Sequence, residues 1–142
     1  MEERLNRHIY QFVEAELRDY KTNKKLIIEY DKELEYTGAK SVLSKDPSGR
    51  FSQNQISDST HNQVVRIMAN ENRIKRAKDY VGCIDDVLKE LSEEQYKLIE
   101  LKYFQGLLTD WGIWKELHIS PRTYYREKNK AIRKFALRMR IL

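Results

Sequence analysis

Apolar residues recur at steps of three, four and seven along two long stretches of the chain, and this spacing constrains the fold more than any other feature. The first stretch contains Ile9, Val13, Leu17, Tyr20, Ile27, Tyr30 and Leu34, and the second contains Val64, Ile67, Ile74, Ala77, Val81, Ile84, Leu88 and Leu91. Residues at these steps share one face of an α-helix. Because 142 residues include only five Gly and two Pro, few turns remain for a many-stranded sheet. The sequence therefore predicts an all-α fold.

The first stretch is too long for one straight helix in a globule. An unbroken helix from Glu3 to Tyr36 would span about 50 Å at 1.5 Å per residue, which exceeds the width of a domain of this size. The run Lys21-Thr22-Asn23 interrupts the apolar series, and Thr and Asn cap a new helix well. We therefore predict a helical hairpin over residues 1–37.

A change of composition separates the two apolar stretches. Residues 38–60 are rich in Ser, Gly, Asn and Gln and contain Pro47 and Gly49, which predicts a flexible linker. The stripe that follows predicts one long amphipathic helix over residues 61–91. Such a stripe fits two roles, packing on the first hairpin or self-association along the stripe.

Residues 92–142 carry the most specific local signals. Ser92 and Gln95 form a capping box at the start of a helix, which we expect to end near Gly106. A short helix from Thr109 to Leu117 follows, and the pair Ser120-Pro121 starts a final helix. Two helices joined by so short a turn predict a helix-turn-helix.

The final helix has two distinct faces. We expect the apolar face to pack toward Ile113, Leu117 and Ile119, and it consists of Tyr124, Ala131, Ile132, Phe135 and Met139. A polar face of this composition suits the major groove of DNA, where the first turns reach base edges and flanking cations reach phosphates. The candidate DNA-contacting residues are Ser120, Arg122, Thr123, Tyr125, Arg126, Asn129, Lys130 and Arg133.

The positive charge is concentrated on this helix. Residues 1–91 hold 16 Lys and Arg and 16 Asp and Glu, so the net charge of +5 belongs to the last third. Residues 118–142 contain eight basic side chains and one acidic one, Glu127. A helix face that only contacts water usually carries charges of both signs. This imbalance therefore favours a polyanionic partner over a simple solvated face.

The segments LSEEQYKLIELKYFQG and LTDWGIWKELHISPRTYYREKNKAIRKFA resemble the C-terminal helix-turn-helix of phage transcriptional regulators of the RinA/ArpU type, which is itself similar to region 4 of sigma-70 factors. The N-terminal part is similar to the RinA arrangement as well. The resemblance implies activation of phage or prophage promoters, late genes in particular. It matches Arg122, Thr123, Tyr125 and Arg126 to recognition-helix positions. Trp114 and Gly112 depart from the pattern, since such motifs usually hold a small residue and often a Glu there.

Other classes of function find little support in the residues. The three histidines are scattered without metal-ligand spacing, and neither a phosphate-binding glycine loop nor a nucleophile motif is present, so we expect no enzyme activity, metal or cofactor. The single cysteine, Cys83, cannot form an internal disulfide. No apolar run is long enough to cross a membrane or to serve as a signal peptide. We expect a soluble protein of the bacterial host cytoplasm, associated with the nucleoid.

These observations favour a sequence-specific double-stranded DNA-binding transcriptional regulator, a phage or prophage late-gene activator that contacts RNA polymerase and forms a homo-oligomer. Two alternatives remain. The first is a DNA-packaging adaptor like a terminase small subunit, and the second is a helical interaction protein without a DNA role.

Overall fold

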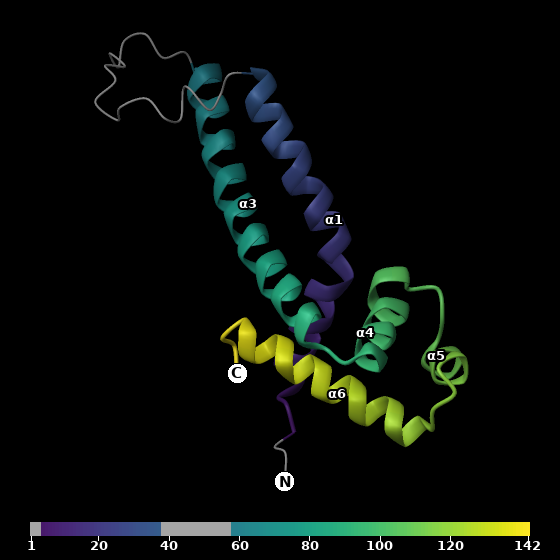
Figure 1. Cartoon of the computed structure of the whole chain (residues 1–142). Coiled ribbons are helices and arrows are strands. Elements are labelled where there is room, and N and C mark those ends of the chain that lie inside the picture. The colour runs from purple at the N-terminus through teal and green to yellow at the C-terminus, as the bar shows by residue number, and fades with distance from the viewer. Residues whose placement is uncertain (1–3, 38–57) are drawn as a thin grey trace. The chain divides into compact units, whose positions relative to one another are not determined.

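The computed structural model describes residues 4–37 and 58–142, and every regular element in these ranges is helical (Figure 1). The elements are α1 (Arg7–Thr37), α3 (Asp58–Glu90), α4 (Glu93–Ile99), the π-helical segment η1 (Glu100–Gln105), α5 (Asp110–Glu116) and α6 (Pro121–Arg138). The predicted all-α fold is confirmed. The predicted linker over 38–60 falls on residues 38–57, which lie outside the described residues, and on the first turn of α3.

The predicted N-terminal hairpin is wrong, because α1 runs unbroken from Arg7 to Thr37. The predicted break rested on the width of a single globule as the limit on helix length. The chain instead divides into two compact units, and α1 contributes residues to both. One unit contains residues 1–23 and 79–142, and the other contains residues 24–78. The predicted break at Lys21-Thr22-Asn23 therefore coincides with a boundary between units, which α1 crosses without losing its helical hydrogen bonds.

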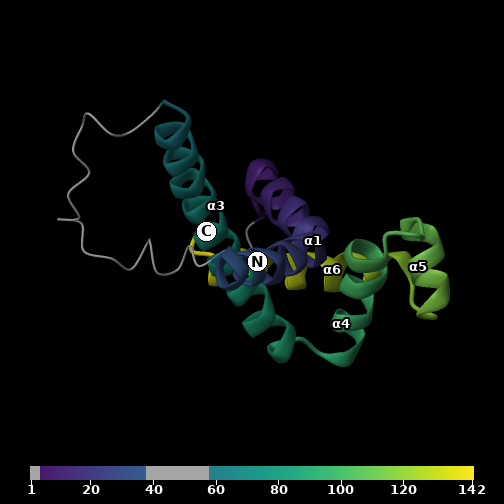
Figure 2. The same cartoon turned by 90° about the horizontal axis from the view of Figure 1, so that it is seen from above.

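The core of the first unit is assembled from segments that are far apart in sequence. Val13 and Leu17 of α1 are completely buried, as are Leu98 and Ile99 of α4, and Ile84 of α3 is nearly so. The helices α4 and α5 both pack on α6 (Figure 2). The largest buried side chains of α6 are Tyr124, Ile132 and Phe135, each with no exposed surface. The N-terminal turns of α1 thus belong to the same folded unit as α6.

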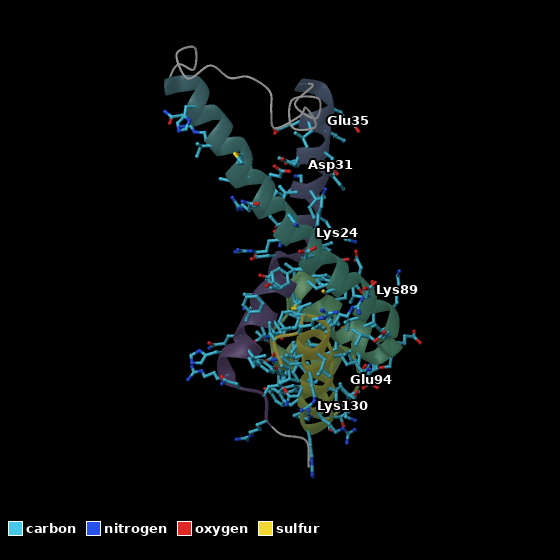
Figure 3. The ribbon with its side chains drawn as sticks, turned by 90° about the vertical axis from the view of Figure 1, so that its left-hand side faces the viewer. Lys24, Asp31, Glu35, Lys89, Glu94 and Lys130 are labelled. Atoms are coloured by element: carbon cyan, nitrogen blue, oxygen red, sulfur yellow. The ribbon has the colours of Figure 1, made fainter. Side chains whose placement is uncertain are left out.

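The described residues of the second unit belong to α1 and α3. Among its described side chains, Ile74 and Ala77 are buried, and Lys78 forms an ion pair with Asp31 at 3.5 Å. Figure 3 labels Lys24, Asp31 and Glu35 along this part of α1. A shallow groove of about 140 Å³ is lined by Leu26, Glu29, Tyr30, Glu33, Asn70, Arg73 and Ile74.

The helix after Ser92 begins and ends where the sequence predicts. Ser92 Oγ accepts a hydrogen bond from the Gln95 amide at 3.2 Å, and Gln95 Oε1 accepts one from the Ser92 amide at 3.3 Å, which completes the capping box. Gly106 terminates η1 with a left-handed φ of 64°, a conformation that costs a glycine little. The final turns before Gly106 widen into the π-helix η1, which the apolar spacing did not indicate.

Candidate nucleic-acid interface

Side-chain caps fix the start of both α5 and α6. Thr109 Oγ1 accepts from the Gly112 amide at 3.2 Å, and Ser120 Oγ accepts from the Thr123 amide at 3.1 Å. Pro121 occupies the first turn of α6, where its missing amide proton costs nothing. Between the two helices, His118 adopts a positive φ of 56°, which turns the chain sharply. Both helix starts agree with the sequence prediction.

The two faces of α6 also agree with the prediction. The side chains of Tyr124, Ala131, Ile132, Phe135 and Met139 are buried. On the adjoining helix, Ile113 is completely buried, while Leu117 and Ile119 in the turn are partly exposed. This packing fixes which side of α6 faces solvent.

The structure brings all eight candidate DNA-contacting residues to the start and outer side of α6. Those with exposed side chains are Ser120, Arg122, Tyr125, Arg126, Asn129 and Lys130, the last of which is labelled in Figure 3. Thr123 and Arg133 are partly exposed. Ser120 and Thr123 also serve the cap, since Ser120 Oγ donates to Thr123 Oγ1 at 2.9 Å. Their hydroxyl groups are thus engaged in starting the helix.

One acidic side chain lies among these cations. Glu127 Oε1 is 3.6 Å from Arg126 Nε and 3.9 Å from Lys130 Nζ. The other oxygen of Glu127 accepts a hydrogen bond from Gln95 Nε2 of α4 at 2.9 Å. Because the Arg126 and Lys130 side chains are 59% and 43% exposed, these ion pairs are weak and leave both cations accessible to a polyanion.

Three of the eight basic residues after His118 have other roles. Lys128 is buried on the packed side of α6, Lys134 Nζ donates to Gln95 Oε1 at 3.4 Å, and Arg138 pairs with Asp86 of α3 at 2.5 Å. The charge count alone overstated the number of cations available to a ligand.

A buried polar cluster attaches α6 to α1. The ammonium group of Lys128 lies 4.0 Å from Glu14 Oε2 and 5.6 Å from the centre of the Tyr10 ring. The same carboxylate accepts a hydrogen bond from the Tyr103 hydroxyl at 2.7 Å. Burial lowers the pKa of Lys128, an effect opposed by the negative charges of Asp110 and Glu14.

A second carboxylate ties α5 to its neighbours. Asp110 accepts a hydrogen bond from the Tyr124 hydroxyl at 2.5 Å and pairs with Lys102 Nζ at 2.7 Å. Burial acts to raise the pKa of Asp110, but the hydrogen bonds from Lys102 and Tyr124 outweigh it, so the pKa lies below its ordinary value. Asp110 is therefore charged at neutral pH and holds the start of α5 against both η1 and α6.

The pairing of Glu14 with Tyr103 and Lys128 was not predicted from the sequence. A usable signal was present, because Glu14 stands one residue after Val13 and three before Leu17, on the apolar side of its helix. An acidic residue in that position needs a buried partner.

Neither a metal site nor a membrane-spanning helix is found in the part of the chain that the structure describes. Within residues 4–37 and 58–142, no group of three or more His, Cys, Asp and Glu side chains is arranged to hold a metal ion. Across the same residues, no helix combines the length and the apolar character that a membrane span requires.

Comparison with known proteins yields one family. A family model described as "Protein of unknown function (DUF722)" matches residues 1–136. No curated protein and no solved structure matches the chain.

Proposed function

This chain belongs to the DUF722 family, and we propose that it is a sequence-specific double-stranded DNA-binding protein whose helix α6 enters the major groove. The observation that carries the proposal is the exposed face of α6. Arg122, Arg126 and Lys130 project from a helix whose opposite side is locked into the core. Asn129 and Tyr125 lie among them, so the same face offers charge for phosphates and hydrogen-bonding groups for base edges.

The short helix α5 supports the same mode of binding. In helix-turn-helix proteins the first helix braces the second, and the start of the second reaches the bases. Here Asp110 fixes α5 to Tyr124 of α6, and the Ser120 cap sets where α6 begins. The residues expected to reach bases, Arg122 to Arg126, occupy the first turns of α6.

We further propose that the protein regulates transcription from phage or prophage promoters in the bacterial cytoplasm, as an activator that contacts RNA polymerase. This part rests on the resemblance of residues 92–142 to RinA/ArpU-type regulators. We include a homo-oligomer in the proposal, since regulators of this kind use two copies to read two half-sites.

The direct test is binding to a pool of random double-stranded DNA, followed by sequencing of the retained fragments. Lys128 is buried, so at most seven of the eight basic residues after His118 can contact phosphates. Each contact contributes about 0.9 to the slope of log affinity against log salt, and residues 118–142 should therefore contribute no more than about 6.3 per subunit. Affinity that is independent of salt would contradict DNA binding.

Substitutions separate base recognition from backbone contacts. Arg126→Ala should weaken binding to the selected site by about 1–3 kcal/mol and relax its sequence preference, because Arg pairs bidentately with guanine. The matched control is Lys97→Ala, which removes one exposed cation from α4, where Lys97 pairs with Glu93 at 3.3 Å. Equal losses from both substitutions would indicate that α6 does not read the sequence.

The regulatory part is tested with a reporter gene driven by a prophage late promoter in cells that lack the phage. We expect transcription to rise when the protein is present and to return to baseline when Arg122 and Arg126 are both changed to Ala. Circular dichroism must show that the double variant is folded. A closed ring in solution without any promoter response would favour a packaging adaptor instead.

A further inference from the structure

Three aromatic rings form a cluster where α5 meets α6. The ring centres of Trp114 and Tyr124 are 5.6 Å apart, those of Trp114 and Tyr125 are 5.9 Å apart, and those of Tyr124 and Tyr125 are 5.1 Å apart. All three pairs meet edge to face, at interplanar angles of 64–76°. This is a favourable geometry for aromatic side chains. Trp114, which departs from the usual helix-turn-helix pattern, thus packs against both tyrosine rings.

The cluster restrains an exposed ring. Tyr124 has no exposed surface, whereas Tyr125 is 44% exposed. Besides its two aromatic neighbours, Tyr125 has the buried Lys128 ammonium 5.9 Å from its ring centre. A ring with neighbours on several sides loses little further freedom on binding, which makes it a suitable contact residue.

The exposed part of Tyr125 is an apolar surface on a polar helix face. Its neighbours on that face are Arg122, Arg126 and Asn129, all exposed. The two arginines suit phosphates and guanine, and the asparagine suits adenine. In the major groove, the chemically matching partner for an apolar ring is the C5-methyl group of thymine.

We propose that Tyr125 recognises a thymine methyl group in the bound DNA and that Trp114 is the positioning residue that holds its ring. The inference rests on the proposed function and adds one base preference to it. The expected specificity is for a duplex with thymine at one fixed place beneath the first turns of α6. The same site with uracil at that place, identical except for the methyl group, should bind more weakly.

The experiment uses the full chain and a duplex selected from random DNA. Each thymine of that duplex is replaced in turn by deoxyuridine, and the dissociation constant is measured by fluorescence anisotropy. We expect one replacement to weaken binding about fourfold, the equivalent of about 0.8 kcal/mol for one buried methyl-sized group. If no single replacement changes affinity by more than about 1.5-fold, or the selected site has no preferred thymine, the proposal is overturned.

Variants then assign the effect to residues. Tyr125→Phe keeps the ring and should keep the sensitivity to the methyl group, whereas Tyr125→Ala should abolish it. Trp114→Phe should retain the sensitivity and Trp114→Ala should lose it. Trp111→Ala is the control, because Trp111 is also a tryptophan of α5 but its side chain is exposed. The Lys115 Nζ atom lies 3.8 Å from the centre of the Trp111 ring.

The outcomes distinguish this inference from the proposed function. If the wild-type chain retains no duplex, DNA binding itself fails, and the methyl contact fails with it. If the chain binds a selected site but Tyr125→Ala still discriminates thymine from uracil, only the methyl contact is refuted. If Tyr125→Ala loses discrimination while folded Trp114→Ala keeps it, the positioning role of Trp114 is refuted.

Discussion

The ion pair between Glu14 and Lys128 joins the first and last helices of one folded unit, and its removal should have a large effect on stability. The two side chains are 15% and 9% exposed, and their charged atoms are 4.0 Å apart. Removing one partner of a buried pair costs about 3–5 kcal/mol. After Lys128→Met, Glu14 would keep its hydrogen bond from Tyr103 and its pairing with Arg18 at 3.7 Å. We therefore expect a loss of about 3 kcal/mol in the free energy of unfolding, at the lower end of that range.

A double-mutant cycle tests the origin of that loss. Changing Glu14 to Leu together with Lys128→Met removes both charges, so the double variant should recover part of the stability and give a coupling energy of about 1–3 kcal/mol in urea unfolding followed by circular dichroism. The matched control is the exposed pair of Glu93 and Lys97 on α4, where the same cycle should give less than about 0.5 kcal/mol. Strictly additive effects of Glu14→Leu and Lys128→Met would refute the ion pair as the link between α1 and α6.

Three further predictions concern pH, capping and assembly. The pKa of Asp110 is lower in the folded chain than its ordinary value of 3.8, so the stability that charged Asp110 contributes is present above that pH and is lost as the pH falls further. Asp110→Asn should reduce this loss of stability in acid, measured by urea unfolding at a series of pH values. An unchanged dependence of stability on pH would contradict the prediction. Ser120→Ala should cost about 1 kcal/mol in thermal unfolding because it removes the cap of α6, whereas Ser120→Asp should retain most of the stability. The exposed side chains of Ile28 and Met68 leave apolar surface on residues 24–78, so we expect an oligomer in sedimentation analysis. Ile28→Lys and Met68→Lys should weaken this oligomer, and a monomer at high micromolar concentration would count against the prediction.

The features that the sequence predicted well depend on neighbouring residues. Ser92 and Gln95 are three positions apart, and Ser120, Pro121 and the Thr123 amide lie within a single turn. The physical cause of each cap is contained in the few residues that form it. For the same reason, the buried and exposed sides of α6 followed from the 3.6-residue period alone.

The features that the sequence did not predict depend on distant contacts. Tyr103 and Glu14 are 89 positions apart, and no local pattern pairs them. The length limit on the first helix failed because it required knowledge of how many compact units the chain forms. Lys128 was counted with the solvent-facing cations, although it stands four residues after Tyr124 and four before Ile132, on the buried side of α6. Net charge records the sign of a segment and not the direction of its side chains.

The location of Lys128 also changes how the proposed DNA-binding part of the chain is delimited. From the sequence, residues 92–142 looked like a self-contained helix-turn-helix. In the structure, Val13 and Leu17 of α1 are buried in the same compact unit as α6. Glu14 forms an ion pair with Lys128, the cation next to the Tyr125 ring. The orientation of the proposed recognition face therefore depends on side chains more than one hundred positions earlier in the sequence. Since α1 continues without a break into residues 24–37, the helix that braces α6 also forms part of the second unit.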